Sequence, residues 1–208
     1  MNFDRVAAPY RWLETAAFGQ QLQQARIAFV REIAAPRRVL VVGEGNGRFL
    51  AAFLQAYPDA AVTCIEASAR MIALTRRRIG KALVDFVEED IREVALPPAH
   101  YDLIVTHFVL DCFNEATLSE VVAKLAHAAK PEASWLLADF REPPDGWEQR
   151  HARFWLRSMY AFFRLTTGID ADQLVDPSPF FREAGFGCHV QRLYRFEMIK
   201  SEWWRRSA

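Results

Sequence analysis

Nothing in this chain limits its architecture more than a glycine-rich turn set between an apolar run and a helical pattern. Val39–Val42 is apolar, Gly43, Gly45 and Gly47 follow in the order G-x-G-x-G, and apolar residues recur at helical spacing from Phe49 onward. Strand, turn and helix in this order are typical of a βα unit in a parallel sheet. Glycine permits a positive φ, and the N-terminus of the next helix offers unpaired N–H groups. The turn therefore predicts a site for a nucleotide or a charged amino-acid moiety.

The rest of the chain repeats the alternation of strand and helix patterns. Strands are expected at 38–43, 61–66, 83–88, 101–106 and 134–140, and as a final antiparallel pair at 186–191 and 193–199. Helices are expected at 20–33, 47–57, 68–79, 115–130, 147–167 and 177–184. These patterns predict one α/β domain with a Rossmann-like, doubly wound, mostly parallel seven-stranded sheet and a C-terminal antiparallel hairpin. Within this single domain (1–208), we expect a helical cap (1–36), a cofactor-binding core (37–140) and an acceptor side (141–208).

The composition narrows the classes of partner. Lys and Arg total 26, Asp and Glu total 26, and the formal net charge is zero, so no nucleic-acid partner is expected. Cys64, Cys112 and Cys188 form no C-x-x-C pair, and neither a zinc pattern nor a metal requirement is visible. The N-terminus lacks the apolar core of a signal peptide, and no apolar stretch approaches the length of a membrane span. A soluble, cytoplasmic protein is expected, and its oligomeric state is not indicated.

The spacing of the turn separates two classes of cofactor. The dinucleotide fingerprint is G-x-G-x-x-G, whereas here Arg48 stands where its third glycine would fall. Glu44 inside the turn would repel a pyrophosphate but suits a cofactor that carries an ammonium and a sulfonium. At this turn the chain resembles the class I S-adenosylmethionine-dependent methyltransferases, whose first motif is an acid-x-Gly-x-Gly turn. The family's acid usually precedes the first glycine, where Val42 stands here, so which acid meets the ammonium stays open.

Further motifs follow in the order that this resemblance implies. Glu66 ends the second strand 23 residues after Gly43, near the roughly 20 expected of an acid that binds ribose hydroxyls. The resemblance implies that Ala67 lies beside it, that Ser68 caps the next helix and that Met71 lies on the adenine, although Met71 equally fits a plain core role. The adenine would meet Asp90 and Ile91, with Glu88 and Glu89 as neighbouring alternatives. Backbone contacts to the methionine end are implied for Thr106 and His107.

The acceptor is expected beyond the carboxyl ends of the strands, where ligands of doubly wound sheets gather. His107, Asp111, Asp139 and Arg141 should converge there, and Tyr10 and Tyr160 are expected to touch the acceptor. If the chain turns helically after 107, Asp111 lies beside His107, raises its pKa and forms a base with it. Alternatively, His107 supplies only backbone contacts to the cofactor and Asp111 only caps the next helix.

The implied activity is methyl transfer to a small molecule. Asp139–Pro143, the aromatic 147–167 helix and the final hairpin look most like the branch that methylates quinone precursors and other lipid-like molecules, so a quinone-like, aromatic or lipid-like acceptor is expected. Arg150, Arg153, Arg157 and Arg164 share one face of that helix, which is either solvated or a contact to an anionic membrane surface. The Trp203–Arg206 segment fits the membrane reading. A nicotinamide-dependent oxidoreductase and a non-catalytic cofactor-binding or membrane-interacting protein remain alternatives.

Overall fold

A single mixed sheet organises the part of the chain that the computed structural model describes, residues 20–145 and 174–206. The strand order is β3-β2-β1-β4-β5-β7-β6, and only the pairings of β7 are antiparallel. The strands are β1 (Arg38–Val42), β2 (Ala61–Ile65), β3 (Val84–Val87), β4 (Tyr101–His107), β5 (Ala129–Phe140), β6 (Phe186–Tyr194) and β7 (Ile199–Arg206). This topology confirms the predicted doubly wound, mostly parallel seven-stranded sheet with its antiparallel end.

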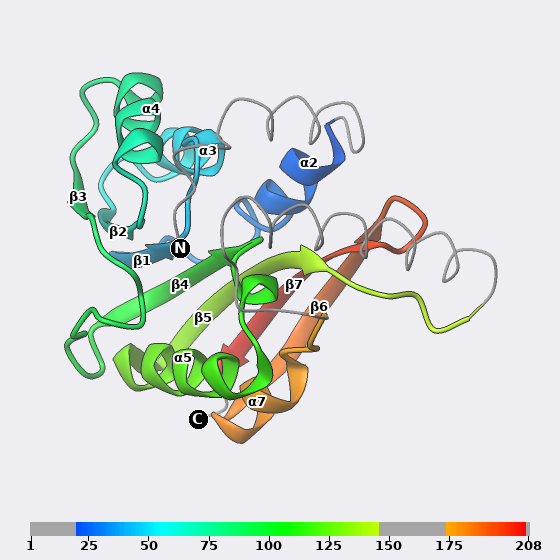
Figure 1. Cartoon of the computed structure of the whole chain (residues 1–208). Coiled ribbons are helices and arrows are strands. Elements are labelled where there is room, and N and C mark those ends of the chain that lie inside the picture. The colour runs from blue at the N-terminus through cyan, green and yellow to red at the C-terminus, as the bar shows by residue number, and fades with distance from the viewer. Residues whose placement is uncertain (1–19, 146–173, 207–208) are drawn as a thin grey trace.

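Helices cover both faces of the sheet (Figure 1). One face carries α2 (Gln21–Ile27), α3 (Arg48–Ala56) and α4 (Ala69–Ile79), and the other carries α5 (Glu115–Ala128) and α7 (Ser178–Glu183). A single 3-10 turn, η1 (Leu110–Cys112), follows β4. The predicted 147–167 helix with its arginine face lies outside the described ranges, and so do Tyr10 and Tyr160. Within those ranges, no helix is both long and apolar enough to cross a bilayer.

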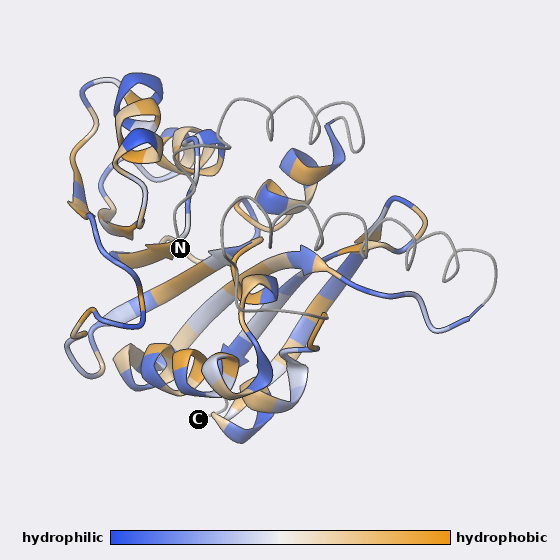
Figure 2. Ribbon diagram, in the orientation of Figure 1, coloured by the Kyte–Doolittle hydropathy of each residue, from blue (hydrophilic) through white to orange (hydrophobic). Residues whose placement is uncertain are grey.

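Two apolar clusters, one on each face, hold the helices to the sheet (Figure 2). Successive strand residues point to opposite faces, so Leu40 and Val42 join the α5 side whereas Val39 and Val41 join the α3 side. All four are buried, as expected for an interior parallel strand. The apolar runs that predicted the strands are therefore explained by burial on both faces.

Local capping fixes where the helices begin. The Ser68 hydroxyl accepts a hydrogen bond from the Met71 N–H at 3.2 Å, so the predicted cap of α4 is confirmed. Asn114 caps α5 in the same way through the Thr117 N–H at 3.0 Å. The predicted helix over 20–33 is shorter, because α2 ends at Ile27 and turns follow.

The C-terminal hairpin differs from its prediction. The turn lies at Arg195–Met198 rather than at residue 192, so β6 reaches Tyr194 and β7 runs from Ile199 to Arg206. Arg195, Phe196 and Glu197 have φ values of 49°, 52° and 61°, a conformation that L residues rarely adopt. Because this turn contains no glycine, proline or asparagine, its sequence resembles that of a strand.

The Trp203–Arg206 segment is an interior strand, so its assignment to a membrane contact is wrong. Trp204 is 1% exposed, and its ring centroid lies 5.0 Å from that of Phe181 in α7. Trp203 donates from Nε1 to the Ser134 hydroxyl at 3.0 Å. Both indoles thus stabilise the packing of β7 rather than anchor the chain elsewhere.

Candidate functional site

Glycine is needed for different structural reasons at the three positions after β1. All three have positive φ, 68° at Gly43, 70° at Gly45 and 80° at Gly47. A Cβ at Gly43 would lie 2.8 Å from Val109 Cγ2, and one at Gly47 would lie 2.8 Å from the backbone of Thr75. At Gly45 a Cβ would meet nothing within 4 Å. Gly43 and Gly47 are therefore required by packing, whereas Gly45 faces open space at the sheet's carboxyl edge.

Gly45 is held in place through both of its backbone polar groups. Its N–H donates to Glu66 Oε2 at 2.9 Å, and its carbonyl accepts from the Thr75 hydroxyl at 3.0 Å. Glu66 Oε1 accepts from the Ser68 N–H at 3.0 Å, and the residue is 8% exposed. The predicted ribose-binding acid thus lies at the glycine turn. Since a carboxylate accepts about four hydrogen bonds, these backbone contacts leave it capacity for a ligand hydroxyl.

Glu44 turns back onto the helix that it precedes. Its Oε1 accepts from the N–H groups of Phe49 and Leu50 at 3.1 and 3.2 Å, in the first turn of α3. Burial raises the pKa of Glu44 to about 8, opposed by these N–H groups and by the charge of Arg26. The side chain therefore caps α3, and its contact with a cofactor ammonium stays a prediction.

Arg26 of α2 belongs to this site and was missed from the sequence. Its guanidinium carbon lies 4.8 Å from the ring centroid of Phe108, and its charge acts on both Glu44 and His107. The available signal was its position next to Ala25 and close to Phe29, which are buried. A cation beside the apolar face of a short helix needs a partner or a ligand.

The three acids that follow β3 differ in burial and in partners. Glu88 and Glu89 are exposed, whereas Asp90 is partly buried and accepts from the backbone N–H, Nε and Nη2 of Arg92 at 3.0, 3.0 and 2.8 Å. These bonds hold the pKa of Asp90 below its usual value. Ile91 is buried, so its backbone rather than its side chain is suited to meet a base. The adenine contacts of Asp90 and Ile91 remain predictions.

The side chains of three further predicted residues, Met71, Ala67 and Thr106, differ in burial and in hydrogen bonding. Met71 is buried at the start of α4, and Ala67 is exposed between Glu66 and the helix cap. Thr106 is fully buried, and its hydroxyl accepts from Trp135 Nε1 at 2.9 Å. The Thr106 side chain is therefore committed to the core, which leaves its backbone for the predicted cofactor contact.

His107 is buried and electrically isolated from carboxylates. It is 7% exposed, packs edge-on against Phe49 with 4.7 Å between ring centroids, and its Nδ1 has no hydrogen-bond partner among the described residues. Burial, followed by the charge of Arg26, lowers the pKa of His107 well below its ordinary value. The expected rise of its pKa beside Asp111 is therefore wrong, because a cation rather than a carboxylate acts on the ring.

The residue after it, Phe108, stores backbone strain at this edge. Its φ is 55°, its N–H donates to the Ala138 carbonyl at 2.7 Å, and its ring lies 5.2 Å from that of Phe140. Left-handed backbone at an aromatic residue costs on the order of 1 kcal/mol, and such residues concentrate at functional sites.

Asp111 pairs with Asp139 instead of His107. The two carboxyls are close enough for each to act on the titration of the other, and the Cys112 thiol donates to Asp111 Oδ1 at 3.7 Å. Burial raises the pKa of Asp111 to about 6 and the pKa of Asp139 well above its usual value, although Lys200 opposes the latter. The carboxyl that acts on Asp111 is that of Asp139, and the role of His107 and Asp111 as a base stays a prediction.

The pair makes stability depend on pH. Asp139 has a folded-state pKa above the unfolded value of about 3.9, so the folded protein binds more protons and loses stability as pH rises through the window between those values. Asp139→Asn should therefore raise Tm at pH 8, on the order of 5 °C, and little at pH 4. Thermal unfolding across this range checks it. The exposed Asp85→Asn is the control, and an equal gain at every pH would contradict the assignment.

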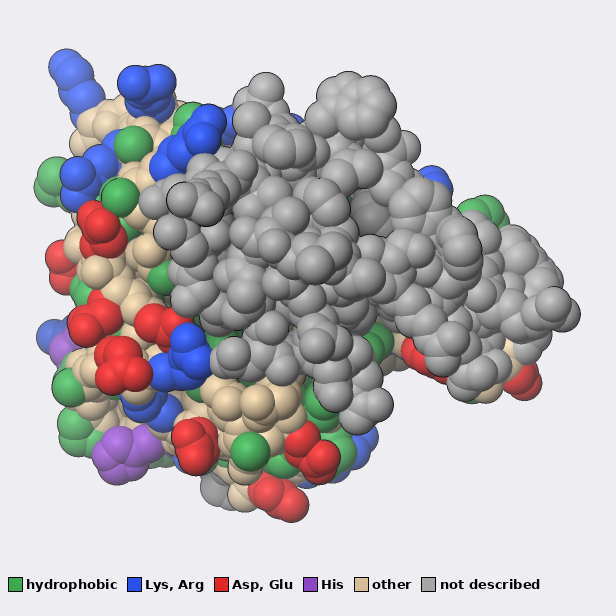
Figure 3. Space-filling model, in the orientation of Figure 1, with side chains coloured by type: hydrophobic (Ala, Val, Ile, Leu, Met, Phe, Trp, Pro, Cys, Tyr) green, Lys and Arg blue, Asp and Glu red, His purple; other side chains and the backbone are tan. Residues whose placement is uncertain are grey.

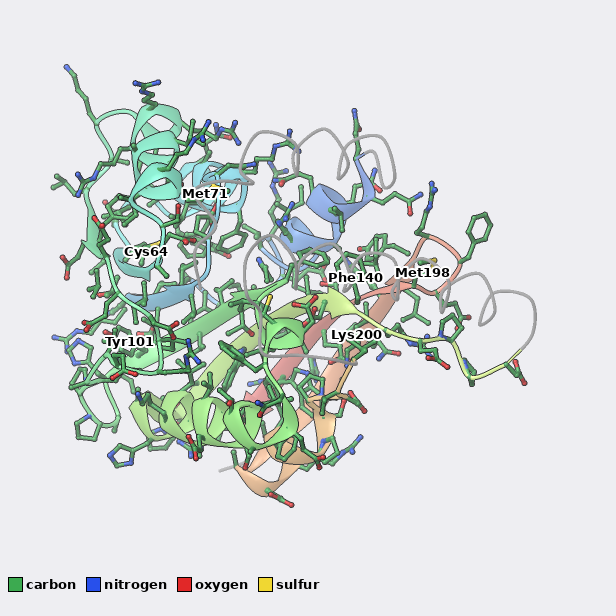
Figure 4. All side chains as sticks on the ribbon, viewed as in Figure 1. Cys64, Met71, Tyr101, Phe140, Met198 and Lys200 are labelled. Atoms are coloured by element: carbon green, nitrogen blue, oxygen red, sulfur yellow. The ribbon has the colours of Figure 1, made fainter. Side chains whose placement is uncertain are left out.

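A cavity of about 410 Å³ lies on the α7 side of the sheet, next to this pair. Its wall includes Phe140 and Arg141, which directly follow Asp139, and Lys200, which is the register partner of Asp139 in β7. Phe140, Met198 and Lys200 are labelled together at the adjoining ends of β5 and β7 in Figure 4. Arg141 reaches the hairpin turn, with Nη1 3.0 Å from Glu197 Oε2, and so does not join the acid pair.

Lys200 is the cavity's buried cation and was not predicted. Its Nζ lies 3.0 Å from Asp176 Oδ1 and 3.4 Å from Glu202 Oε2. Polar residues, Ser201 and Glu202, follow it directly, so the sequence pattern did not mark it as buried. The cavity therefore contains a compensated charge cluster rather than an apolar floor.

Comparisons with known proteins agree with this geometry. Residues 39–132 match a family model described as a methyltransferase domain. A malonyl-[acyl-carrier protein] O-methyltransferase of Priestia megaterium is 30% identical over 112 residues, which are 54% of this chain and 38% of that protein. One from Anoxybacillus flavithermus is 27% identical over 120 residues, covering 58% of this chain and 45% of that protein. The chain thus spans less than half the length of the curated relatives that it matches.

Solved structures of low identity share the fold. The 1,6-didemethyltoxoflavin-N1-methyltransferase of Burkholderia thailandensis, with its substrate and S-adenosylhomocysteine bound, has a TM-score of 0.69 at 16% identity and covers 98% of this chain and 84% of its own. An N-methyltransferase of Bradyrhizobium japonicum in complex with S-adenosylhomocysteine has a TM-score of 0.64 at 15% identity, with coverages of 99% and 90%. Residues 39–132, fewer than half of the chain, thus match the methyltransferase domain model, and the chain shares the fold of these S-adenosylhomocysteine-bound methyltransferases.

Proposed function

We propose that this protein transfers a methyl group from S-adenosylmethionine to a small-molecule acceptor. The observation that carries the proposal is Gly45, whose missing side chain leaves open space while Glu66 and Thr75 fix its backbone. A peptide that is fixed by two hydrogen bonds and has no side chain over it suits a ligand that packs directly on the peptide plane. The acid, the glycine turn and the strand-end motifs that the cofactor needs are all present at one edge.

Each part of the cofactor has a group of suitable chemistry. Glu66 would accept from the ribose hydroxyls, and Asp90 and Ile91 would meet the adenine, with Met71 against its ring. Arg26 would pair with the methionine carboxylate, because its charge acts on Glu44 in the glycine turn. Backbone groups of Thr106 and His107 would receive the ammonium. These residues bind and orient, and the cofactor supplies an already activated methyl group.

The acceptor is proposed to enter over the ends of β4 and β5. The names of the two curated relatives favour a lipid-like or carrier-linked acceptor, whereas the toxoflavin enzyme favours an aromatic one. That no nucleic acid binds stays an expectation from the zero net charge, and the face drawn in Figure 3 exposes both basic and acidic side chains. The Trp203–Arg206 segment no longer supports a membrane contact, so that expectation depends on residues outside the described ranges.

Direct titration separates methyl transfer from the oxidoreductase alternative. S-adenosylhomocysteine is expected to bind at least roughly tenfold more tightly than NADH, a difference of about 1.4 kcal/mol. The Glu44 carboxyl already occupies the Phe49 and Leu50 N–H groups that a pyrophosphate would need, and Arg48 stands where the third glycine of the dinucleotide fingerprint would fall. Isothermal calorimetry of both ligands under one buffer measures the difference. Tighter NADH binding would favour the oxidoreductase, and cofactor binding without turnover of any acceptor would favour a binding protein.

A further inference from the structure

We infer that Lys124 of α5 is a positioning residue for the adenine of the cofactor. Its ammonium group binds two carbonyls in the loop after β3 and thereby fixes the Ile91 N–H at the place where the base is proposed to bind. This role rests on the proposed function and adds a residue from the face of the sheet opposite α3 and α4. A change at Lys124 should therefore alter how well the protein distinguishes the base of its cofactor.

The loop after β3 is shaped by bonds that Asp90 accepts. The Asp90 carbonyl accepts from the Glu93 N–H at 2.9 Å. Its carboxylate accepts from the Arg92 N–H at 3.0 Å and from the Arg92 guanidinium at 3.0 and 2.8 Å. All of these bonds lie within four residues, so they shape the turn without fastening it to another element.

Lys124 fixes the two peptide groups that donate the backbone bonds of this turn. Its Nζ donates to the Ile91 carbonyl at 3.1 Å and to the Arg92 carbonyl. A peptide group is planar, so a bond to its carbonyl also fixes the direction of the N–H on its other side. The N–H groups opposite these two carbonyls are those of Arg92 and Glu93, which donate to Asp90. Lys124 thus acts through Asp90 on the next peptide group.

That next peptide group, between Asp90 and Ile91, carries the donor for the base. Its carbonyl is held by the Glu93 N–H, so the Ile91 N–H points to the opposite side. Ile91 is 4% exposed, yet its N–H donates to no acceptor in 20–145 or 174–206. Such a donor on a buried residue is rare and is explained by a ligand that accepts from it. Adenine N1 is an acceptor of this kind, and the amine next to N1 would meet the Asp90 carboxylate.

Lys124 makes this contact although a carboxylate is available on its own helix. Glu120 lies one turn earlier in α5, in the order that favours a Glu–Lys ion pair on a helix surface. Among the described residues, however, Lys124 forms no ion pair with any carboxylate, and Glu120 is exposed. The half-buried ammonium is thus directed to the two carbonyls of the loop rather than to a surface charge.

The buried side chain of Ile91 gives the loop a second, independent support. It belongs to the apolar cluster on the α5 face, together with Val94 and Leu125. Apolar packing holds the position of the side chain but has no preferred direction for the peptide groups beside it. Loss of the ammonium should therefore leave the loop in place and release the orientation of the Ile91 N–H.

The 1-deaza analogue of S-adenosylhomocysteine measures the contact with the base, because it keeps the amine and has C–H in place of N1. In calorimetric titration of the wild-type full chain, the analogue should bind roughly tenfold more weakly than S-adenosylhomocysteine, a difference of about 1.4 kcal/mol. In Lys124→Met, S-adenosylhomocysteine should bind more weakly, and the ratio of the two affinities should fall below about threefold.

A lysine that only stabilises the fold would give a different result. Lys124→Met would then weaken both ligands by the same factor and leave their ratio as in the wild type, which would overturn the inference. Lys130→Met is the matched control and should leave both affinities unchanged, since Lys130 is half-buried and its Nζ lies 3.3 Å from Asp102 Oδ2, near the start of β4. Lys124→Arg keeps a cation with several donors and should restore much of the ratio.

The wild-type titrations separate this inference from the proposed function. If S-adenosylhomocysteine and its 1-deaza analogue bind equally well, the Ile91 N–H does not meet N1, and the inference is overturned while cofactor binding stands. If S-adenosylhomocysteine does not bind, the proposed function fails and the inference fails with it. If Lys124→Met does not fold, Lys124→Gln, which is uncharged and one atom shorter, takes its place and should narrow the ratio in the same way.

Discussion

Gly45→Val is expected to abolish the binding of S-adenosylhomocysteine, with a loss of affinity beyond roughly 1,000-fold, or about 4 kcal/mol. The new side chain would project into a space that no atom of residues 20–145 or 174–206 approaches within 4 Å, which is where the cofactor is proposed to lie. It would also strain a residue whose φ is 70°, at a cost of about 1–2 kcal/mol in stability. Calorimetric titration of the folded variant measures the affinity.

Gly80 offers a matched control for the strain. It caps the end of α4 with a φ of 65°, and a Cβ there also meets nothing within 4 Å. Gly80→Val should therefore lose stability yet bind S-adenosylhomocysteine as the wild type does. If both variants lose binding, unfolding rather than the cofactor site explains the result. If folded Gly45→Val keeps its affinity, the glycine turn serves only the fold.

Glu66→Ala should weaken S-adenosylhomocysteine binding by on the order of 2–3 kcal/mol, or roughly 30- to 150-fold. The variant removes the carboxylate proposed to accept from the ribose hydroxyls. It also leaves the N–H groups of Gly45 and Ser68 without their present acceptor, so part of the loss would come from a looser turn. The two contributions need separate measurement.

A 2′-deoxy analogue of S-adenosylhomocysteine separates them. In wild-type protein the analogue should bind more weakly than the parent ligand, because one ribose hydrogen bond to Glu66 is missing. In Glu66→Ala the two ligands should bind equally, since the partner of that hydroxyl has gone. A persistent difference between the ligands in the variant would mean that Glu66 supports the turn but does not touch the ribose.

The parallel part of the fold was predictable because its signals are local. Buried strands such as Val39–Val42 are continuous apolar runs, and the glycine turn and the Ser68 cap are set by residues adjacent in sequence. The hairpin turn was not predictable in the same way. Its left-handed residues Arg195, Phe196 and Glu197 are closed locally by the Met198 N–H to the Arg195 carbonyl, and the ion pair of Arg141 with Glu197 ties the turn to the end of β5.

The residues of the candidate site also differ in whether their positions follow from local sequence or from tertiary structure. Glu66 was found because strand ends in a parallel sheet share one edge, and the spacing from Gly43 placed it there. The partner of Asp111 was not found, because it depends on the path of η1 and on a residue 28 positions later in β5. Arg26 was overlooked for a simpler reason, since its helix was interpreted only as a cover for the sheet.

The position of β7 has a consequence for how the chain is made. β7 is last in sequence yet lies between β5 and β6, so β6 has no neighbour in the sheet until residues 199–206 have been synthesised. Until then Trp135 and Phe181 lack Trp204, and the β5 edge is open to pairing with other chains. The half of the sheet that bears the glycine turn can form during translation, whereas the half that bears Lys200 and the cavity must wait for its completion.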